Sequence, residues 1–537
     1  MKLLITLLTT CFALNLSAQV IDLSSQQNSL ADTFDLPWPQ WVFEHWVWED
    51  ESTQESALQI VDDYLAHDIP VSAIIIDSPW ETGYNTFEWD TALFHDAQAM
   101  IDSFHSRDVK VLLWITGIIN IDEGAIYDDA AAAGYFMKTL PFDNNPAVVN
   151  WWKGDGSLID WFNPDAVTWW KGLMDNMLDM GIDGWKCDGT DFSAIQTPWS
   201  DGANSFISRL DYSHAYYQIH FDYTREVLGD DAVIHARPID NYGIADIGGE
   251  QVSFSPVQTG FATWVGDQDA TFEGLGWALN NMYHSAEMGY LVIGSDIGAY
   301  RENDLYPTNG RSKELFIRWA QLSTFCGLME NGGGGEHRPW MFDQETEDIY
   351  RDLVEFRYET LVPYLMSHSE AYFSSEQSLM QFFNNSDYSF MLGPDYFVAP
   401  FLEEGTDITV NFPPGFEWIY LYDNAQVYQG GTSESLTVPY SEYPVFVKGN
   451  ALSVDELSEA QVAIYPNPVE DLLNISIYEN GVKDATVELF DISGKLLLSE
   501  ALIGLQNTLD ISAFKAGIYQ IRIQANEKMA IRKIIKR

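Results

Sequence analysis

Short apolar runs alternate from Pro37 to about Pro363 with stretches in which apolar residues recur every three or four positions. The first pattern is typical of buried strands, and the second of helices that cover a sheet. Eight such units predict a parallel α/β fold, a (β/α)8 or TIM barrel with insertions. The predicted strands are Trp41–Trp46, Val71–Asp77, Val109–Ile115, Ile182–Asp188, Ala232–Arg237, Phe261–Gly266, Tyr290–Asp296 and Ser323–Met329.

Amphipathic segments between these strands are expected to cover the outside of the barrel. They include Gln54–His67, Ala97–Arg107 and Val167–Met180. The stretch from Asn120 to Asn163 is too long for a plain loop, and its Trp and Gly residues favour an insertion at the rim.

Beyond Pro363 the helical period fades, and short apolar runs alternate with Gly, Pro and Asn turns. This pattern predicts a small antiparallel β domain followed by a C-terminal β-sandwich module. The predicted divisions are a signal peptide at 1–18, an N-terminal lead at 19–37, the barrel at 38–365, a β-sandwich domain at 366–450, a linker at 451–460 and the last module at 461–537.

The N-terminus carries Lys2, an apolar run to about Leu14 and the small residues Ser17 and Ala18, which is the pattern of a signal peptide. A lipoprotein linked through Cys11 is an alternative. No later apolar stretch is long enough for a transmembrane span. Removal of the peptide leaves Cys187 and Cys326, which form neither a disulfide framework nor a structural zinc site.

The composition is strongly acidic, with 27 Lys and Arg against 80 Asp and Glu and a formal net charge of −53. A field of this sign repels phosphate backbones and argues against nucleic-acid binding. The 19 Trp residues exceed what packing usually needs, and sugar-binding sites are one use for them.

Four predicted strands end at or near an aspartate: Asp77, Asp188, Asp267 and Asp296. Working groups of a (β/α)8 barrel gather at the carboxyl ends of its strands. A single such aspartate could instead cap the next helix. Four of them favour a shared pocket, in which Arg237 would offset the negative charge.

Two carboxyl groups, one ionised and one protonated, are what glycoside hydrolysis requires. Metal-assisted hydrolysis is the competing chemistry of barrels, but it needs clustered ligands, and the 10 His residues are scattered. We therefore expect no catalytic metal and no organic cofactor.

The segment Gly184–Asp191 (GWKCDGTD) resembles the nucleophile segment of glycoside hydrolase family 31, the retaining α-glycosidases, and Trp264–Phe272 (WVGDQDATF) resembles its general acid/base stretch. Further matches in the family's order are Asp77 with Trp80, Trp114, Trp151–Pro164 (WWKGDGSLIDWFNP), Arg237, Gly294–Tyr300 (GSDIGAY), Arg318–Gln321 (RWAQ) and Met391–Gly405 (MLGPDYFVAPFLEEG). The resemblance covers about residues 38 to 448.

This resemblance implies roles for individual residues. Asp188 would form a covalent glycosyl-enzyme, and Asp267 would protonate the leaving group and then activate water. The other implied substrate contacts are Asp77 and Asp296 to sugar hydroxyls, Arg237 to the nucleophile and the sugar, and Trp80, Trp114, Trp185 and Trp264 around the pocket.

The sequence departs from the family's pattern in two places. Where the family usually carries an Arg and a His near the last strand, this chain has Glu330 and, after four glycines, His337. Either residue could bind the sugar, or the segment could be a structural loop, so the sugar and its linkage stay open. Only about 20 mature residues precede the barrel, so the family's N-terminal β-sandwich is nearly absent.

The last module contains Ile464–Pro468 (IYPNP), Leu489–Lys495 (LFDISGK) and a basic end. It resembles the C-terminal sorting domain of the type IX secretion system, and a carbohydrate-binding sandwich is the alternative. A sorting role implies export to the surface or the medium through the secretion machinery.

Taken together, the sequence predicts a secreted or surface-attached α-glycosidase, similar to α-glucosidases, that acts on an oligosaccharide or polysaccharide. An α-galactosidase or α-xylosidase is the alternative within the family. From another class, the chain could be a glycan-binding protein without catalysis.

Overall fold

The computed structural model describes residues 39–190, 195–240, 252–302, 311–451, 455–456, 462–478, 485–490, 496–502, 504, 506–525 and 528–537. The expected signal peptide and N-terminal lead, Asp191 and most of the expected linker lie outside these residues. The chain divides into two compact units, residues up to 408 with 436–445, and residues 409–435 with 446–537.

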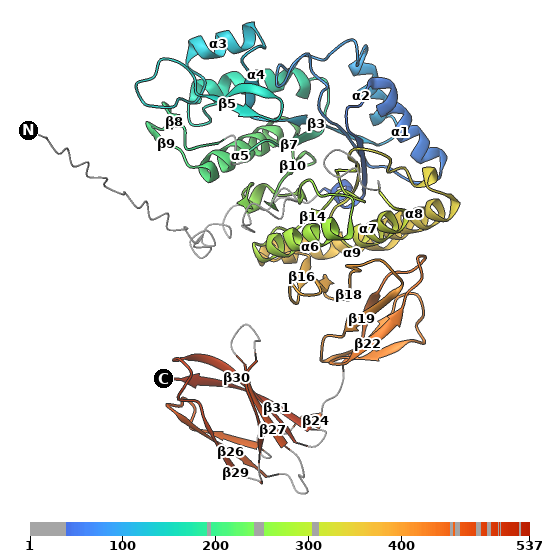
Figure 1. Ribbon diagram of the computed structural model, residues 1–537, viewed down its shortest axis with the longest axis vertical. Helices are drawn as coiled ribbons and strands as arrows, with labels where there is room; N and C mark the ends of the chain where they lie inside the picture. The colour runs from blue at the N-terminus through green and yellow to red at the C-terminus, as the bar shows by residue number, and fades with distance from the viewer. Residues whose placement is uncertain are drawn as a thin grey trace, which may run out of the picture. The chain divides into compact units, whose positions relative to one another are not determined.

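The first unit contains a nearly closed barrel of eight parallel strands, in the order β14, β13, β10, β7, β3, β2, β1 and β15 (Figure 1). A parallel bridge between Asp296 and Glu330 links the two ends of this sheet. The strands are β1 (His45–Glu49), β2 (Ala73–Ile76), β3 (Lys110–Ile115), β7 (Gly184–Cys187), β10 (Val233–Ala236), β13 (Ala262–Trp264), β14 (Ile293–Gly294) and β15 (Met329–Asn331).

The prediction of a (β/α)8 barrel is confirmed, but its first and last strands lie elsewhere than expected. Residues 40–43 form a 3-10 helix, and the chain becomes a strand only from His45. At the other end, α7 stays helical to Thr324 and β15 begins at Met329. The residues of α7 from Leu315 to Thr324 are all buried, so their apolar run does not distinguish a helix from a strand.

The outer layer consists of α1 (Gln54–Ala66), α2 (Ala97–His105), α4 (Pro164–Leu178), α5 (Arg209–Leu228), α6 (Phe272–Glu287), α7 (Lys313–Thr324), α8 (Gln344–Phe356) and α9 (Val362–Ser374) (Figure 1). Local sequence sets where several of them begin. Thr53 and Ser56 form a capping box at α1, and Asn163 caps α4 with Pro164 in its first turn.

The helix α9 corrects the expectation that helical structure ends near Pro363. It continues to Ser374 from a π-helical segment, Arg357–Leu361. Pro363 lies in the first turn of α9, directly after the π-helical segment.

The expected rim insertion forms a subdomain with a helix and a small antiparallel sheet. The sheet contains β4 (Ile118–Asn120), β6 (Gly154–Leu158) and β5 (Val148–Trp151), and α3 (Ala125–Ala133) lies between β4 and β5 in the chain. Shorter elements follow at β8 (Trp199–Ser200), β9 (Ser205–Phe206), β11 (Ile239–Asp240) and β12 (Val252–Ser253).

Antiparallel strands follow α9, as the sequence predicts. In the first unit β17 (Phe390–Leu392) pairs with β16 (Met380–Phe382) and β18 (Tyr396–Val398). In the second unit β20 (Phe416–Tyr420) pairs with β21 (Val427–Gln429) and β23 (Val445–Ala451). The strands β19 (Asp407–Asn411) and β22 (Ser433–Thr437) complete this region.

The last module consists of two antiparallel layers around one apolar core. The larger layer pairs β28 (Leu496–Leu502), β27 (Ala485–Phe490), β30 (Gly517–Ala525) and β31 (Lys528–Lys536), and β24 (Asp455–Glu456) joins its edge. The smaller layer contains β25 (Val462–Tyr465), β26 (Leu472–Ile477) and β29 (Gln506–Asp510).

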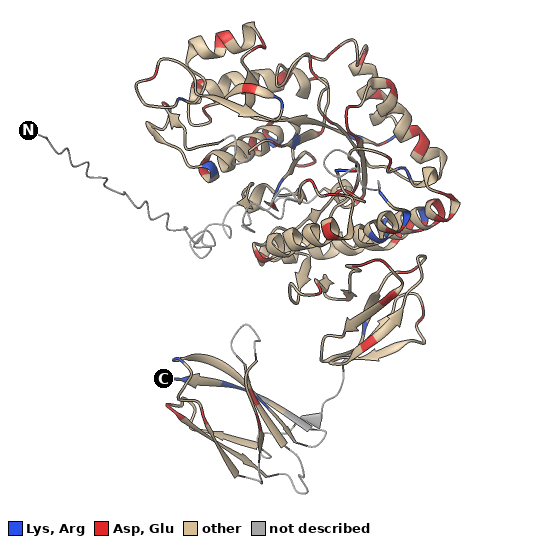
Figure 2. Cartoon of the chain, in the orientation of Figure 1, with Lys and Arg blue, Asp and Glu red and all other residues tan. Residues whose placement is uncertain are grey.

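Acidic residues are scattered over the helices of the barrel, with fewer basic residues between them (Figure 2). Among the described residues, no helix combines the length and the apolar character that crossing a membrane would require.

Candidate active site

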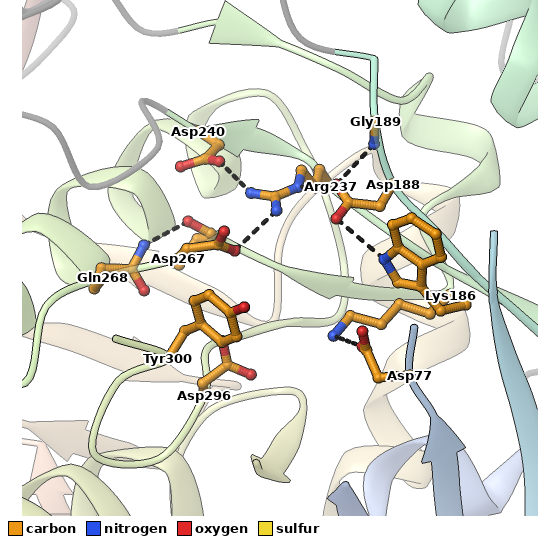
Figure 3. Close-up of polar contacts among 12 residues, drawn as sticks. Asp77, Lys186, Asp188, Gly189, Arg237, Asp240, Asp267, Gln268, Asp296 and Tyr300 are labelled. Carbon is orange, nitrogen blue, oxygen red and sulfur yellow. Dashed lines mark hydrogen bonds and ion pairs between the residues drawn. The ribbon is translucent and has the colours of Figure 1, made fainter. Parts of the chain in front are cut away.

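A single arginine at the carboxyl end of β10 holds three carboxylates. Arg237 Nε donates to Asp188 Oδ1 at 2.8 Å, Nη1 to Asp240 Oδ2 at 2.7 Å and Nη2 to Asp267 Oδ1 at 2.8 Å (Figure 3). A guanidinium presents its donors in a rigid planar fork, so these three bonds fix the carboxylates relative to one another. Asp188, after β7, and Asp267, after β13, are the two residues expected to catalyse, and both therefore contact the same guanidinium.

Asp188 follows β7 and is ionised in its surroundings. Burial raises the pKa of its carboxyl, but the charge and hydrogen bond of Arg237, the charge of Lys186 and the Gly189 N–H outweigh burial and lower the pKa overall. Trp114 Nε1 lies 3.3 Å from Oδ2, and the Gly189 N–H donates to Oδ1 at 2.8 Å. The carboxylate is thus held in position as a nucleophile requires.

Asp267 follows β13, and its side chain is more exposed than that of Asp188, at 28% against 13%. Gly266, just before it, has φ +84°, and a Cβ there would lie 2.1 Å from Asp240 Oδ2 and 2.5 Å from Arg237 Nη1. Only glycine leaves room for the ion pair between these two residues. The turn that presents Asp267 is therefore part of the site.

A second ion pair lies beside the first. Lys186 Nζ donates to Asp77 Oδ2 at 2.8 Å and stands 3.4 Å from the ring centroid of Trp48. Burial lowers the pKa of Lys186, but the charges of Asp77, Asp296 and Glu330 raise it overall, so the amine is protonated. Trp264 also packs near this ammonium, at 5.4 Å.

Asp296, Glu330 and His235 form a buried polar cluster near this ammonium. Burial raises the pKa of both carboxyls, and the charge of Glu330 raises that of Asp296 further, to well above its usual value. Burial, followed by the charges of Lys186 and Arg237, lowers the pKa of His235 well below its usual value. His235 Nε2 lies 2.8 Å from Glu330 Oε2, although the two atoms lack hydrogen-bond geometry.

Most of the residues predicted to catalyse or to bind substrate lie together around Arg237 and Lys186. The site gathers Asp77, Asp188, Asp267, Asp296, Arg237, Trp114 and Trp264. Trp80 adjoins it by donating from Nε1 to the carbonyl of Trp114 at 2.8 Å. Glu330 has no exposed surface and belongs to the buried cluster near Lys186.

Trp185 and His337 lie apart from this group. Trp185 packs against Phe87, at 5.9 Å between ring centroids, on the face of β7 opposite to Lys186. Residues of a strand alternate between faces, so Lys186 and Asp188 face inward while Trp185 and Cys187 face outward. His337 is buried, and burial, followed by the charges of Arg311 and Arg338, lowers its pKa well below the usual value. Its backbone carbonyl accepts a hydrogen bond from the side-chain amide of Asn331.

Lys186, Asp240 and Tyr300 belong to the site although they were not expected there, and Trp48 belongs to it as well. The sequence did indicate a place for Lys186 in the site, because Lys186 lies two positions before Asp188 and side chains two positions apart point to the same face of a strand. Trp48 is the last aromatic residue of β1 and precedes two acidic residues, which is weaker evidence for a place in the site. The position of Asp240 depends on the path of the loop after β10, which no local pattern determines.

A cavity of about 460 Å³ lies between the site and the rim insertion. Its lining includes Trp80, Tyr84, Trp114, Asn120 and Lys153. The insertion therefore contributes to the surroundings of the site. Among the described residues, no group of three or more His, Cys, Asp or Glu side chains is arranged to hold a metal ion.

A nearly closed (β/α)8 barrel that presents two carboxyl groups at its strand ends fits the chemistry of a glycoside hydrolase. The chain belongs to glycosyl hydrolases family 31. Residues 36–368 match the TIM-barrel domain of that family, and residues 369–452 match its C-terminal domain. Residues 463–537 match a secretion system C-terminal sorting domain, so the protein is exported.

Relatives that match this chain are about a quarter identical to it over the aligned residues. An α-xylosidase of Emericella nidulans is 24% identical over 84% of this chain and 57% of its own length. Alpha-glucosidase 2 of Bacillus thermoamyloliquefaciens is 22% identical over 88% of this chain and 60% of its own length. The chain thus spans about three fifths of the length of these relatives.

Solved structures show the same fold. A family 31 α-xylosidase from a soil metagenome, complexed with xylose, superposes with a TM-score of 0.66 at 20% identity and covers 78% of this chain and 64% of its own. A dextranase mutant of Flavobacterium johnsoniae, complexed with isomaltotriose, superposes with a TM-score of 0.67 at 17% identity and covers 93% of this chain and 62% of its own.

Proposed function

We propose that this protein is a retaining α-glycosidase that removes terminal α-linked sugars, with Asp188 as nucleophile and Asp267 as general acid/base. The observation that carries this proposal is the shared hydrogen bonding of both carboxyl groups to Arg237. One guanidinium spans their nearest oxygens, which suits the separation of about 5 to 5.5 Å of a retaining pair.

In the first step the Asp188 carboxylate attacks the anomeric carbon, and the glycosidic C–O bond breaks. Asp267 gives a proton to the departing oxygen, which leaves as an alcohol. Arg237 donates a hydrogen bond to Oδ1 of Asp267, so the transferred proton is placed on Oδ2. In the second step Asp267 takes a proton from water, whose oxygen displaces Asp188 from the anomeric carbon.

The substrate is proposed to be an oligosaccharide or polysaccharide fragment, with α-glucoside as the first candidate. The names of the relatives support α-glucosidase and α-xylosidase activity about equally. An α-galactosidase is a further alternative, and a glycan-binding protein without catalysis is the alternative from another class. Binding alone would not require two carboxyl groups on one arginine.

Turnover of a panel of aryl α-glycosides and α-glycosyl fluorides tests the proposal. Asp188→Ala should abolish turnover, whereas Asp129→Ala, at an exposed position of α3, should leave it unchanged. Proton NMR should show the α anomer as the first product. A β product would exclude retention, and no turnover of any member would favour the binding protein.

The expected sorting role of the tail leads to a second proposal. We infer that the type IX machinery carries the protein across the outer membrane and removes the tail on the way. Mass spectrometry of the exported protein should show an end near residue 460. A full-length exported chain that retains residues 463–537 would contradict removal.

A further inference from the structure

Asp50 and Tyr300 form a polar pair beside the site that the mechanism above does not use. Asp50 follows β1, and Tyr300 lies in the segment between β14 and α7. The Tyr300 hydroxyl donates to Asp50 Oδ2 at 3.3 Å. Both side chains are partly exposed, unlike the buried cluster around Asp296.

Electrostatic contacts place the pair among the catalytic and sugar-binding groups. The charges of Asp267, Asp50 and Asp77 act on the Tyr300 hydroxyl, after burial, to raise its pKa. Burial, followed by the charge of Asp77, raises the pKa of Asp50 to about 6, while Lys186 opposes this shift. A carboxylate that is poorly solvated in this way gains when a ligand hydroxyl donates to it.

The ring of Tyr300 is held in place by a stack. It lies parallel to Trp48, at 5.9 Å and 16°, and Lys186 contacts the ring of Trp48. Trp48 is fixed by its Nε1, 3.3 Å from Asp296 Oδ1, and by Gly332, where a Cβ would come within 2.0 Å of the indole. The Tyr300 hydroxyl and Asp50 are thus positioned in advance of binding.

We infer that Asp50 and Tyr300 bind one hydroxyl of the sugar that is released, and so help to select that sugar. This inference rests on the proposed function. The Tyr300 hydroxyl commits its proton to Asp50, so the pair presents oxygen acceptors, and the substrate hydroxyl acts as the donor. A site built to bind a hydroxyl rejects an analogue without it, because its polar groups then stay unpaired.

Monodeoxy analogues of the α-glycosyl fluoride that the wild type turns over provide the test. A fluoride has no leaving-group ring, so only contacts to the released sugar are measured. In the wild type, removal of the recognised hydroxyl should lower kcat/KM by about 10- to 100-fold, as expected for a hydrogen bond to a charged acceptor.

In Tyr300→Phe, which keeps the ring and its stack on Trp48, the penalty at that one position should fall to less than about threefold, while the other positions keep their penalties. Asp50→Asn should reduce the same penalty. Tyr283→Phe is the matched control, because Tyr283 donates to Glu287 at 2.7 Å on the outer helix α6. It should keep every wild-type penalty.

Unchanged penalties at all positions in both Tyr300→Phe and Asp50→Asn would overturn the inference and leave the proposed function intact. Failure of the wild type to turn over any glycosyl fluoride or aryl glycoside would instead overturn the proposed function, and the inference with it.

Discussion

Arg237→Lys tests whether the planar fork of the guanidinium, and not only its charge, organises the two catalytic carboxyl groups. Lysine keeps the positive charge but offers a point-like ammonium that cannot span Asp188, Asp240 and Asp267 at once. A hydrogen bond to a charged group contributes about 1.5 to 3 kcal/mol. Loss of two of the three bonds therefore predicts a fall in kcat/KM of about 10²- to 10⁴-fold.

The same substitution should change the pH dependence. Burial raises the pKa of Asp188, and Arg237 contributes most to the net lowering. A depressed pKa keeps the carboxylate ionised until the pH falls through that pKa. With weaker contacts from lysine the pKa of Asp188 rises, so the acid limb of the profile of kcat/KM should move to higher pH.

The assay is kcat/KM for a glycosyl fluoride as a function of pH, in the wild type, Arg237→Lys and a control. Arg225→Lys is the matched control, because Arg225 lies on the outer helix α5 and donates to the carbonyl of Ala232. An activity within threefold of the wild type, together with an unmoved acid limb, would refute the reasoning about the fork.

Three further substitutions probe the frame of the site. Arg357→Met removes a buried guanidinium that donates to five backbone carbonyls, one in the 3-10 helix at residues 40–43 and four just before β15. The free energy of unfolding should fall by at least about 3 kcal/mol, which urea unfolding would show as a lower midpoint. Gly332→Ala forces the indole of Trp48 to shift, so it should lower the free energy of unfolding by about 1 to 3 kcal/mol and raise KM. Gly276→Ala is the control, because Gly276 on α6 has open space around it, and it should not destabilise the protein. Lys186→Met leaves Asp77, its buried carboxylate partner just after β2, without a cation and should cost about 3 to 5 kcal/mol by urea unfolding.

Much of the site follows from local sequence. An apolar run that ends in an aspartate predicts a barrel strand with a carboxylate at its active end, and this reasoning alone selects Asp77, Asp188, Asp267 and Asp296. The prediction that Trp185 lines the pocket was wrong, because it ignored the alternation of side chains along a strand. The alternation that turns Cys187 outward also turns Trp185 outward and Lys186 inward.

Local sequence patterns were enough to predict the order of the βα units, the acidic residues at their ends and the module at the C-terminus, because these depend on patterns within a few residues. Contacts between distant segments set where the first and last strands begin, bury Glu330 near Lys186, and bring Asp240 and Tyr300 to the site. These features depend on how the barrel closes and how its loops return, and both are set by packing between segments far apart in the chain.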